Sequence, residues 1–326
     1  GVQWPPDVSP GVWLLERIDA DWGAPSMHAV VPRGFEAYAR ILHPATRARP
    51  VGQAWPPLPQ DRHKAEWAAF TQAAPEIDTE HVRWGDVARA FGTTLHPEAQ
   101  WHRLVSRDDP YGHEAAQDAA GWQYGDPEQG RLNPAVLAAV ASTLAAHTEN
   151  PDEGYVAVWE GWGGLLGDMG SMSASTTIAL AAKDDVTYTS HEEMLARSIH
   201  NPWNDGYAKE RWIPGILSDE ISRGPRLTLP ERGHVLFTGG ITEFTDATWA
   251  ERMPWTHPES AWFSATPSLM WPGDRAWALV TEIDYDSTVV GGSAALIAQL
   301  CADTRLETFA LPEGADLSWT GDTINR

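Results

Sequence analysis

The sequence is almost without cysteine. Cys301 is the only one among 326 residues, so no disulfide can form within the chain. Proteins of oxidising compartments are often held together by disulfides. We therefore expect a cytoplasmic location, although a leader removed before Gly1 would leave the same sequence.

Positive charge is also scarce. The chain has 23 lysines and arginines against 45 aspartates and glutamates, a net charge of −22. Such a surface repels nucleic-acid backbones and anionic membranes, and no apolar run approaches the roughly 20 residues of a membrane span. We expect a soluble protein whose partner is a small molecule or a protein, with no nucleic acid and no membrane. The arginine-rich, lysine-poor composition is typical of a GC-rich bacterial genome.

Several catalytic signatures are missing. The sequence contains no HExxH, CxxC, GxSxG or Walker A pattern, so nothing predicts a zinc site, a nucleophile-elbow hydrolase or a P-loop enzyme. A strand running into Gly161, Gly163 and Gly167 resembles a dinucleotide-binding turn, with Asp184 or Asp185 in the place of the ribose-binding acid. A mobile loop near a cleft is the alternative interpretation.

Tryptophan, in contrast, is abundant. The 18 tryptophans outnumber the 7 tyrosines and 7 phenylalanines together. Indoles fill cores, but they also stack on sugars and line ligand clefts. In Trp159-Glu160-Gly161-Trp162 a carboxylate stands between two indoles, which is the combination that sugar sites use. Trp159, Trp162 and Trp277 are therefore candidate ligand-binding residues.

The hydrophobic pattern predicts an α+β fold, with helices mainly in the first half and antiparallel β-sheet mainly in the second. The expected helices are Arg62–Ala73, Trp84–Phe91, Pro97–Val105, Asn133–His147 and Ser293–Ala302. The expected strands are Gly11–Asp19, Phe35–Leu42, Tyr155–Trp159, Thr176–Ala182, Gly233–Ile241, Trp262–Ala265, Arg275–Asp284 and Leu306–Leu311. Pro44–Pro59 is expected to be an irregular loop. We expect residues 1–326 to form one compact unit, with a seam near 150–154.

A weak repeat runs through the chain. The order Trp-Pro-x-Asp, tryptophan, apolar stretch, Ile-Asp-x-Asp occurs at residues 4–21 and 271–286, with a fainter copy at 227–241. Proline and aspartate favour turns, so the repeat predicts a duplicated β-hairpin unit. Chance in a chain rich in tryptophan and aspartate is the alternative.

The sharpest motif is Asp284-Tyr-Asp286-Ser-Thr288, which follows the apolar stretch Trp277–Val280. It resembles the first motif of the haloacid dehalogenase superfamily. The resemblance implies a doubly wound domain, with Asp284 as nucleophile, Asp286 as general acid–base and Mg²⁺ between carboxylate and phosphate. The alternative is that these carboxylates end a strand and cap a turn.

The same carboxylates allow a less specific interpretation. In an extended strand, Glu282, Asp284 and Asp286 project from one face. Three such oxygen ligands suit Mg²⁺ or Ca²⁺, and no other cofactor is predicted. Two carboxyl groups can instead act as acid and base, and Glu160 with Asp284 or Asp286 is the candidate pair of a glycosidase.

Two functions follow from these observations. The first is a non-catalytic binding or interaction protein with a tryptophan-rich recognition surface. The second is a hydrolase of glycans or phosphoesters that uses Glu160, Asp284 and Asp286 in a tryptophan-lined cleft. The lack of a complete catalytic motif favours the first narrowly, and convergence of the three carboxylates in one cavity would favour the second.

Overall fold

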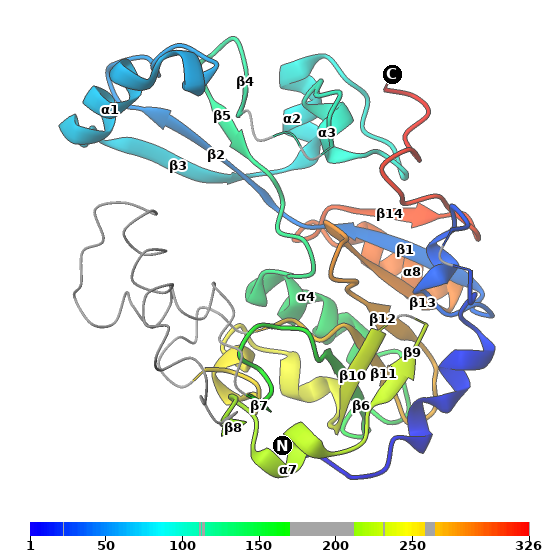
Figure 1. Ribbon diagram of the computed structural model, residues 1–326. Coiled ribbons are helices and arrows are strands. Elements are labelled where there is room, and N and C mark those ends of the chain that lie inside the picture. The colour runs from blue at the N-terminus through cyan, green and yellow to red at the C-terminus, as the bar shows by residue number, and fades with distance from the viewer. Residues whose placement is uncertain are drawn as a thin grey trace, which may run out of the picture.

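The structure is a computed structural model that describes residues 1–21, 23–110, 112, 115–169, 212–230, 232–257 and 265–325. The expected strand Thr176–Ala182, and all but the last residue of Trp262–Ala265, lie outside these residues. The fold is mixed α+β, as predicted. Its main parts are a large antiparallel sheet, a smaller antiparallel sheet, and helices that pack on them (Figure 1).

The large sheet has eight strands, and every neighbouring pair is antiparallel. In order across the sheet they are β14 (Thr308–Leu311), β1 (Ala37–Leu42), β13 (Ser287–Gly292), β12 (Ala278–Val280), β11 (Leu269–Pro272), β6 (Gly154–Trp159), β10 (Arg232–Thr238) and β9 (Leu227–Leu229). The order mixes strands from both halves of the chain. β1 precedes residues 150–154, while β6 begins there, so both sides of that segment contribute to one sheet.

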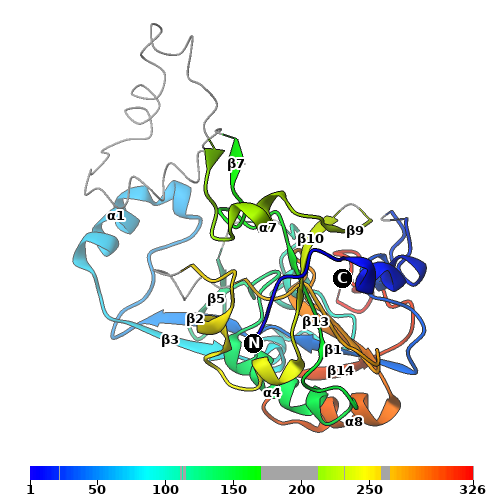
Figure 2. The ribbon, with the colours of Figure 1, turned by 90° about the horizontal axis from the view of Figure 1, so that it is seen from below.

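Both faces of the large sheet are buried. Successive side chains of a strand point to opposite faces, and in β6 Val156 and Val158 contribute to one core whereas Ala157 contributes to the other. The first core lies under helices α4 (Pro134–Ala145) and α8 (Ala294–Ala302), which Figure 2 shows side by side. The second lies under the N-terminal segment and the segment after β14. Burial on both faces explains why these strands read as continuous apolar runs.

The smaller sheet has four antiparallel strands. They are, in order, β3 (Ile77–Val82), β2 (Ala45–Pro50), β5 (Gln123–Gly125) and β4 (Ala116–Gln117). Helices α2 (Trp84–Phe91) and α3 (Trp101–Leu104) share a third core with this sheet, in which Trp84 and Trp101 meet edge to face with ring centroids 5.4 Å apart. Helix α1 (Lys64–Ala73) has no buried residue.

The remaining described elements are short. They are the strand pair β7 (Asp168–Met169) and β8 (Trp212–Ile213), helix α7 (Asp219–Arg223), and the 3₁₀ helices η1 (Ser9–Glu16), η2 (Met27–Ala29), η3 (Gln60–Arg62), η5 (Ile241–Phe244) and η6 (Trp249–Arg252). In the part of the chain that the structure describes, no helix has the length and apolar character needed to cross a membrane.

Strands β1 and β2 follow each other across the boundary between the two sheets (Figure 1). His43, between them, is fully enclosed, with Nδ1 2.6 Å from the Glu128 carbonyl oxygen and Nε2 2.9 Å from Thr288 Oγ1. Burial lowers the pKa of His43 to about 4, so the ring is neutral at pH 7. The junction is therefore a packed, hydrogen-bonded part of the core.

Two expected elements are of a different type in the structure, and the expected helix Pro97–Val105 is helical only over α3. The expected strand Gly11–Asp19 is instead occupied by the 3₁₀ helix η1, which has a proline in its first turn, where the fixed φ of proline suits a helix start. The expected loop Pro44–Pro59 contains strand β2. In β2 the side chains of Arg47 and Arg49 point to the same face, and each guanidinium carbon lies 4.4 Å from the centroid of the Trp122 ring. These cation–π contacts give the charged strand a packed face.

The repeat is only partly reflected in the structure. The segments at 227–241 and 271–286 contain the antiparallel hairpin pairs β9–β10 and part of β11–β12. The N-terminal segment forms η1 instead of a strand. A duplicated hairpin therefore does not extend to the N-terminal copy.

Candidate functional site

The Asp284 motif lies on a turn that connects β12 to β13. The expected strand Arg275–Asp284 ends at Val280, so the carboxylates follow the strand instead of alternating along it. The Tyr285 backbone N–H donates to the Glu282 carbonyl oxygen at 3.0 Å, and the Gly130 N–H donates to the Tyr285 carbonyl oxygen at 2.9 Å. Gly130 has φ +66°, and a Cβ there would lie 2.6 Å from Ile283 Cα. Only glycine fits this support of the turn.

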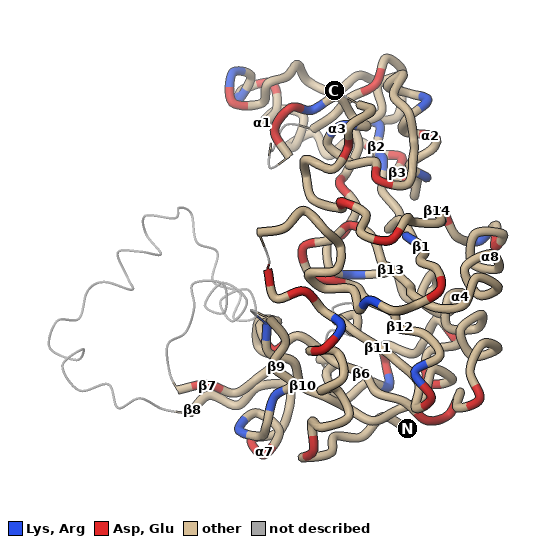
Figure 3. The backbone as a smooth tube through the Cα atoms, turned by 90° about the vertical axis from the view of Figure 1, so that its right-hand side faces the viewer, with Lys and Arg blue, Asp and Glu red and all other residues tan. Residues whose placement is uncertain are grey.

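A cavity of about 760 Å³ opens beside this turn. Its walls come from five parts of the chain: the loop around η2, the α3 region, the segment before α4, the β12–β13 turn, and the C-terminal tail, which we define as residues 312–325. Figure 3 shows Asp and Glu residues on several loops between the two sheets. The polar lining includes Gln100, His102, Arg107, Asp126, Gln129, Glu282, Asp284, Asp286, Ser287 and Ser318.

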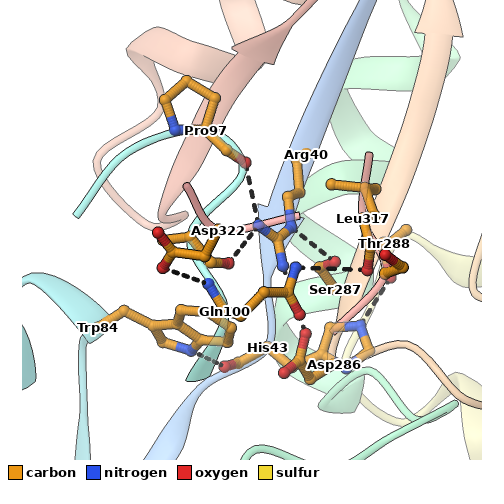
Figure 4. A network of polar contacts seen from close by, with 12 residues as sticks. Arg40, His43, Trp84, Pro97, Gln100, Asp286, Ser287, Thr288, Leu317 and Asp322 are labelled. Atoms are coloured by element: carbon orange, nitrogen blue, oxygen red, sulfur yellow. Dashed lines mark hydrogen bonds and ion pairs between the residues drawn. The ribbon is translucent and has the colours of Figure 1, made fainter. Parts of the chain in front are cut away.

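Asp286 belongs to a buried network centred on Arg40 (Figure 4). The Arg40 side chain is 1% exposed, and its Nη2 lies 3.5 Å from Asp286 Oδ1. Arg40 Nε donates to Ser287 Oγ at 2.9 Å, and Nη1 donates to the carbonyl oxygens of Pro97 and Ala99 at 3.0 and 2.7 Å. Burial raises the pKa of Asp286 above its ordinary value, and Arg40 opposes that rise. The arginine thus holds the carboxyl at the cavity wall from behind.

Glu282 and Asp284 share a second arginine. Arg232, at the start of β10, places Nε 2.7 Å from Glu282 Oε1 and Nη2 2.6 Å from Asp284 Oδ2. The Asp284 N–H also donates to Glu282 Oε2. The Glu282 side chain is 5% exposed whereas that of Asp284 is 68% exposed. Burial raises the pKa of Glu282, and Asp284 presents the accessible carboxylate of the pair.

Asp126 and Arg107 also line the cavity, together with two residues of α3. Asp126 accepts hydrogen bonds from Trp101 Nε1 at 2.8 Å and from both Arg107 Nη atoms at 3.3 and 2.8 Å. His102 is 5% exposed, lines the cavity, and has no hydrogen-bond partner for Nε2 among the described residues. Burial, followed by the nearby Arg103 and Arg107 charges, lowers the pKa of His102, which favours the neutral ring.

The C-terminal tail adds an indole to the cavity. Trp319 is 52% exposed and lines the cavity. Downstream of it, Asp322 fixes the tail to the α3 region by accepting a hydrogen bond from the Gln100 N–H at 3.1 Å (Figure 4). It also pairs with His96 at 2.8 Å. Burial would raise the Asp322 pKa, but hydrogen bonds from Asn325, His96 and Gln100 outweigh it and hold that pKa below its ordinary value.

The structure brings Glu282, Asp284 and Asp286 to one cavity but leaves Glu160 out of it. Glu160 instead accepts from Arg226 Nε at 3.0 Å. Trp159 and Trp162, on either side of it, are half-buried and meet edge to face, 5.7 Å apart. They do not line this cavity either. Glu160 therefore does not line the cavity that Asp284 and Asp286 share.

Trp277 is a core residue. It is 1% exposed, and its Nε1 donates to the Leu144 carbonyl oxygen of α4 at 3.1 Å. A ligand cannot reach its ring faces, since α4 and α8 pack over this side of the sheet. The prediction that Trp277 binds a ligand is therefore wrong, because its side chain is part of the core.

The expected metal site is not formed. Within the described ranges, no group of three or more His, Cys, Asp or Glu side chains is arranged to hold an ion. Glu282, Asp284 and Asp286 lie on a turn instead of one strand face, and arginines contact all three. The prediction of a Mg²⁺ or Ca²⁺ site, which assumed that the three side chains project from one face of a strand, is therefore not supported by this geometry.

Neither sequence resemblance is matched by the surrounding fold. β12 and β13 are antiparallel, as are all pairs in the described sheets, whereas the haloacid dehalogenase resemblance implies a doubly wound parallel sheet. The glycines after β6 are followed by a turn and the short β7 instead of a helix. Asp184 and Asp185 lie outside the described residues.

Arg40, which supports the cavity from behind, and the other residues that line the cavity were not predicted. Arg40, Asp126, His102 and Trp319 are scattered over the chain and carry no local pattern. Arg40 and Ser287, for example, are 247 residues apart. The one available signal was the abundance of tryptophan, and it pointed to other indoles.

No protein-family model matches the chain, and no match was found to a curated protein or to a solved structure.

Proposed function

We propose that the protein is a non-catalytic binding protein whose cavity beside the β12–β13 turn takes a small, hydroxyl-rich ligand of the carbohydrate class. The observation that carries the proposal is an accessible indole, Trp319, in one cavity with the carboxyl groups of Asp284 and Asp286. Indole faces stack on the apolar faces of sugars, and carboxylates accept hydrogen bonds from hydroxyl groups.

The size of the cavity supports a small molecule. Ligand pockets usually enclose about 300–1,000 Å³, and this cavity encloses about 760 Å³. Apolar lining from Trp101, Leu317 and Trp319 accompanies the polar groups. A mixed lining of this kind suits a ligand with both C–H and O–H surface.

The charges in the lining argue against a phosphorylated ligand. Arg107 is the arginine of the lining, and both of its Nη atoms already contact Asp126. Asp284 and Asp286 would repel a phosphate group. Of the ligand classes that the sequence left open, a glycan is therefore better supported than a phosphoester.

The acceptors are held in place before a ligand arrives. Arg40 is fully buried behind Asp286, and Arg232 is 19% exposed behind Glu282 and Asp284. Side chains that are already ordered lose little conformational entropy on binding. This arrangement supports binding by a preformed site.

Calorimetric titration with a panel of neutral disaccharides tests the proposal, with tryptophan fluorescence as a second readout. We expect saturable binding and a quenched or shifted emission. Trp319→Ala should weaken affinity by roughly tenfold, since it removes the stacking surface. The matched control is Ile324→Ala, which truncates another exposed side chain of the tail that does not line the cavity. Absence of binding to every sugar, or unchanged affinity in Trp319→Ala, would contradict the proposal.

Glycoside hydrolysis is a second candidate, and one observation favours it. Asp286 is a buried carboxyl with a raised pKa, in the same cavity as the accessible Asp284. A carboxyl with a raised pKa suits the general acid of such reactions, which also need a second carboxyl group as base or nucleophile. Release of reducing ends from oligosaccharides, which Asp286→Asn abolishes while it weakens sugar affinity far less, would support hydrolysis. Unaltered oligosaccharides after prolonged incubation would leave binding as the function.

A further inference from the structure

We infer that the ligand carries a protonated amino group, which binds at the Glu282–Asp284–Asp286 end of the cavity. The inference rests on the proposed function and specifies its ligand as an amino sugar. It follows from the balance of charge in the lining, from the side on which the arginines lie, and from an unpartnered histidine.

Four carboxyl groups line the cavity: Glu282, Asp284, Asp286 and Asp126. Three guanidinium groups contact these four carboxyl groups. Arg232 contacts both Glu282 and Asp284. Arg40 contacts Asp286, and Arg107 contacts Asp126. If every carboxyl group is counted as ionised, one formal negative charge is left at the pair that shares Arg232. The net charge of −22 on the whole chain adds to the negative field.

The carboxylates face the cavity and two of the arginines do not. Asp284 is 68% exposed, whereas Arg40 is 1% exposed. Arg232 does not line this cavity, although Glu282 and Asp284 do. Asp284 directs Oδ2 to Arg232, and its Oδ1 has no hydrogen bond within the described residues. An ammonium group in the cavity therefore meets carboxylate oxygen before it meets a guanidinium group.

His102 supplies a second, independent observation. His102 is 5% exposed and lines the cavity, and its Nε2 has no hydrogen-bond partner in the described part of the chain. Burial lowers its pKa. A neutral imidazole does not repel a cation, and a buried ring nitrogen is costly to leave without a hydrogen bond.

A set of three disaccharides that differ only at C2 tests the inference. Cellobiose carries a hydroxyl group there, diacetylchitobiose a neutral amide, and chitobiose an amino group. Titrations at about pH 6, where amines of this kind are largely protonated, and at low salt isolate the effect of the charge. Hydrogen bonds to charged groups contribute roughly ten- to hundredfold to a binding constant, so chitobiose should bind at least about tenfold more tightly than cellobiose.

Two variants locate the charge. Asp284→Asn should weaken chitobiose binding at least about tenfold more than cellobiose binding, because it removes the charge of an exposed side chain and keeps its shape. Glu313→Gln is the matched control, since it removes one negative charge from a 60% exposed side chain that does not line the cavity. It should keep the preference. Raising the salt concentration should weaken chitobiose binding more than cellobiose binding.

The results distinguish the inference from the function on which it rests. Binding of cellobiose or diacetylchitobiose at least as tight as that of chitobiose overturns the amino-group inference and leaves carbohydrate binding standing. A preference for chitobiose that survives Asp284→Asn also overturns it. Absence of binding for all three dimers overturns both.

Discussion

Substitution of Arg40 by methionine tests whether the buried network holds the β12–β13 turn in place. Methionine keeps the unbranched apolar stem of arginine and removes its guanidinium group. The substitution takes away the charge partner of Asp286, 3.5 Å away, together with donors to Ser287 Oγ and two carbonyl oxygens. The carboxyl is then left at the cavity wall without a cation behind it.

The expected cost is large. Removal of one partner from a buried ion pair usually costs about 3–5 kcal/mol, and water from the adjacent cavity can reach some of the freed acceptors. We expect Arg40→Met to lower the free energy of unfolding by about 4 kcal/mol, a large part of the roughly 5–15 kcal/mol that holds a typical protein folded. Arg89→Met is the matched control. Arg89 is 78% exposed and pairs with Asp86, so its loss should cost at most about 1 kcal/mol.

The pH dependence identifies the cause. The folded-state pKa of Asp286 is already raised, and loss of Arg40, which opposes that rise, raises it further. A group with a raised folded-state pKa stabilises the fold at low pH, and this contribution is lost as the pH increases through the folded-state value. The deficit of Arg40→Met should therefore be smaller at pH 5 than at pH 7.

Urea unfolding, followed by tryptophan fluorescence, measures these differences. The double variant Arg40→Met/Asp286→Asn should be more stable than Arg40→Met by about 1–2 kcal/mol at pH 7, because it removes the uncompensated charge. A loss below about 1 kcal/mol in Arg40→Met would refute the reasoning. So would a deficit that is unaffected both by Asp286→Asn and by pH.

Three further substitutions follow from positions described above. Trp277→Ala should lower the free energy of unfolding by about 3–5 kcal/mol, since it empties a core site, and should leave sugar affinity at low temperature unchanged in calorimetry. Gly130→Ala should cost about 1–3 kcal/mol through its positive φ and the contact with Ile283, and should also weaken sugar binding because the turn must shift. Asp322→Asn should cost about 1–3 kcal/mol in urea unfolding at pH 7 and speed amide exchange in the C-terminal tail. Because the Asp322 pKa is lowered in the folded state, this difference should shrink as the pH falls below 4.

Local signals predicted the elements that have local causes. Helix α4 was predicted from Asn133 and Pro134, and Asn133 Oδ1 does accept the Ala135 N–H at 2.9 Å. Strands β6 and β10 were predicted because burial on both faces leaves a continuous apolar run. Strand β3, in contrast, has four exposed residues in sequence from Asp78 to His81. Its position is fixed by pairing with β2, which leaves no hydrophobic pattern in the sequence.

The candidate site was predictable to a similar extent. Asp284 and Asp286 were recognised as a group because they are two residues apart in sequence, and they do share a cavity. Their arginine partners and Trp319 come from distant segments, so only the fold reveals them. The choice of Trp277 failed for a physical reason, since tryptophan serves the core as readily as a ligand site and sequence alone does not separate the two.

The pairing of β1 with β13 has a consequence for biosynthesis. β1 is synthesised long before both of its neighbours in the sheet, β13 and β14. Arg40 and Ser287, which are hydrogen-bonded to each other between β1 and β13, are 247 residues apart. At ribosomal rates of about 5–20 residues per second, roughly 10–50 s separate their emergence. During that interval Tyr38, Ile41 and Leu42 have no neighbouring strand, so this apolar segment stays unpaired until β13 has been synthesised.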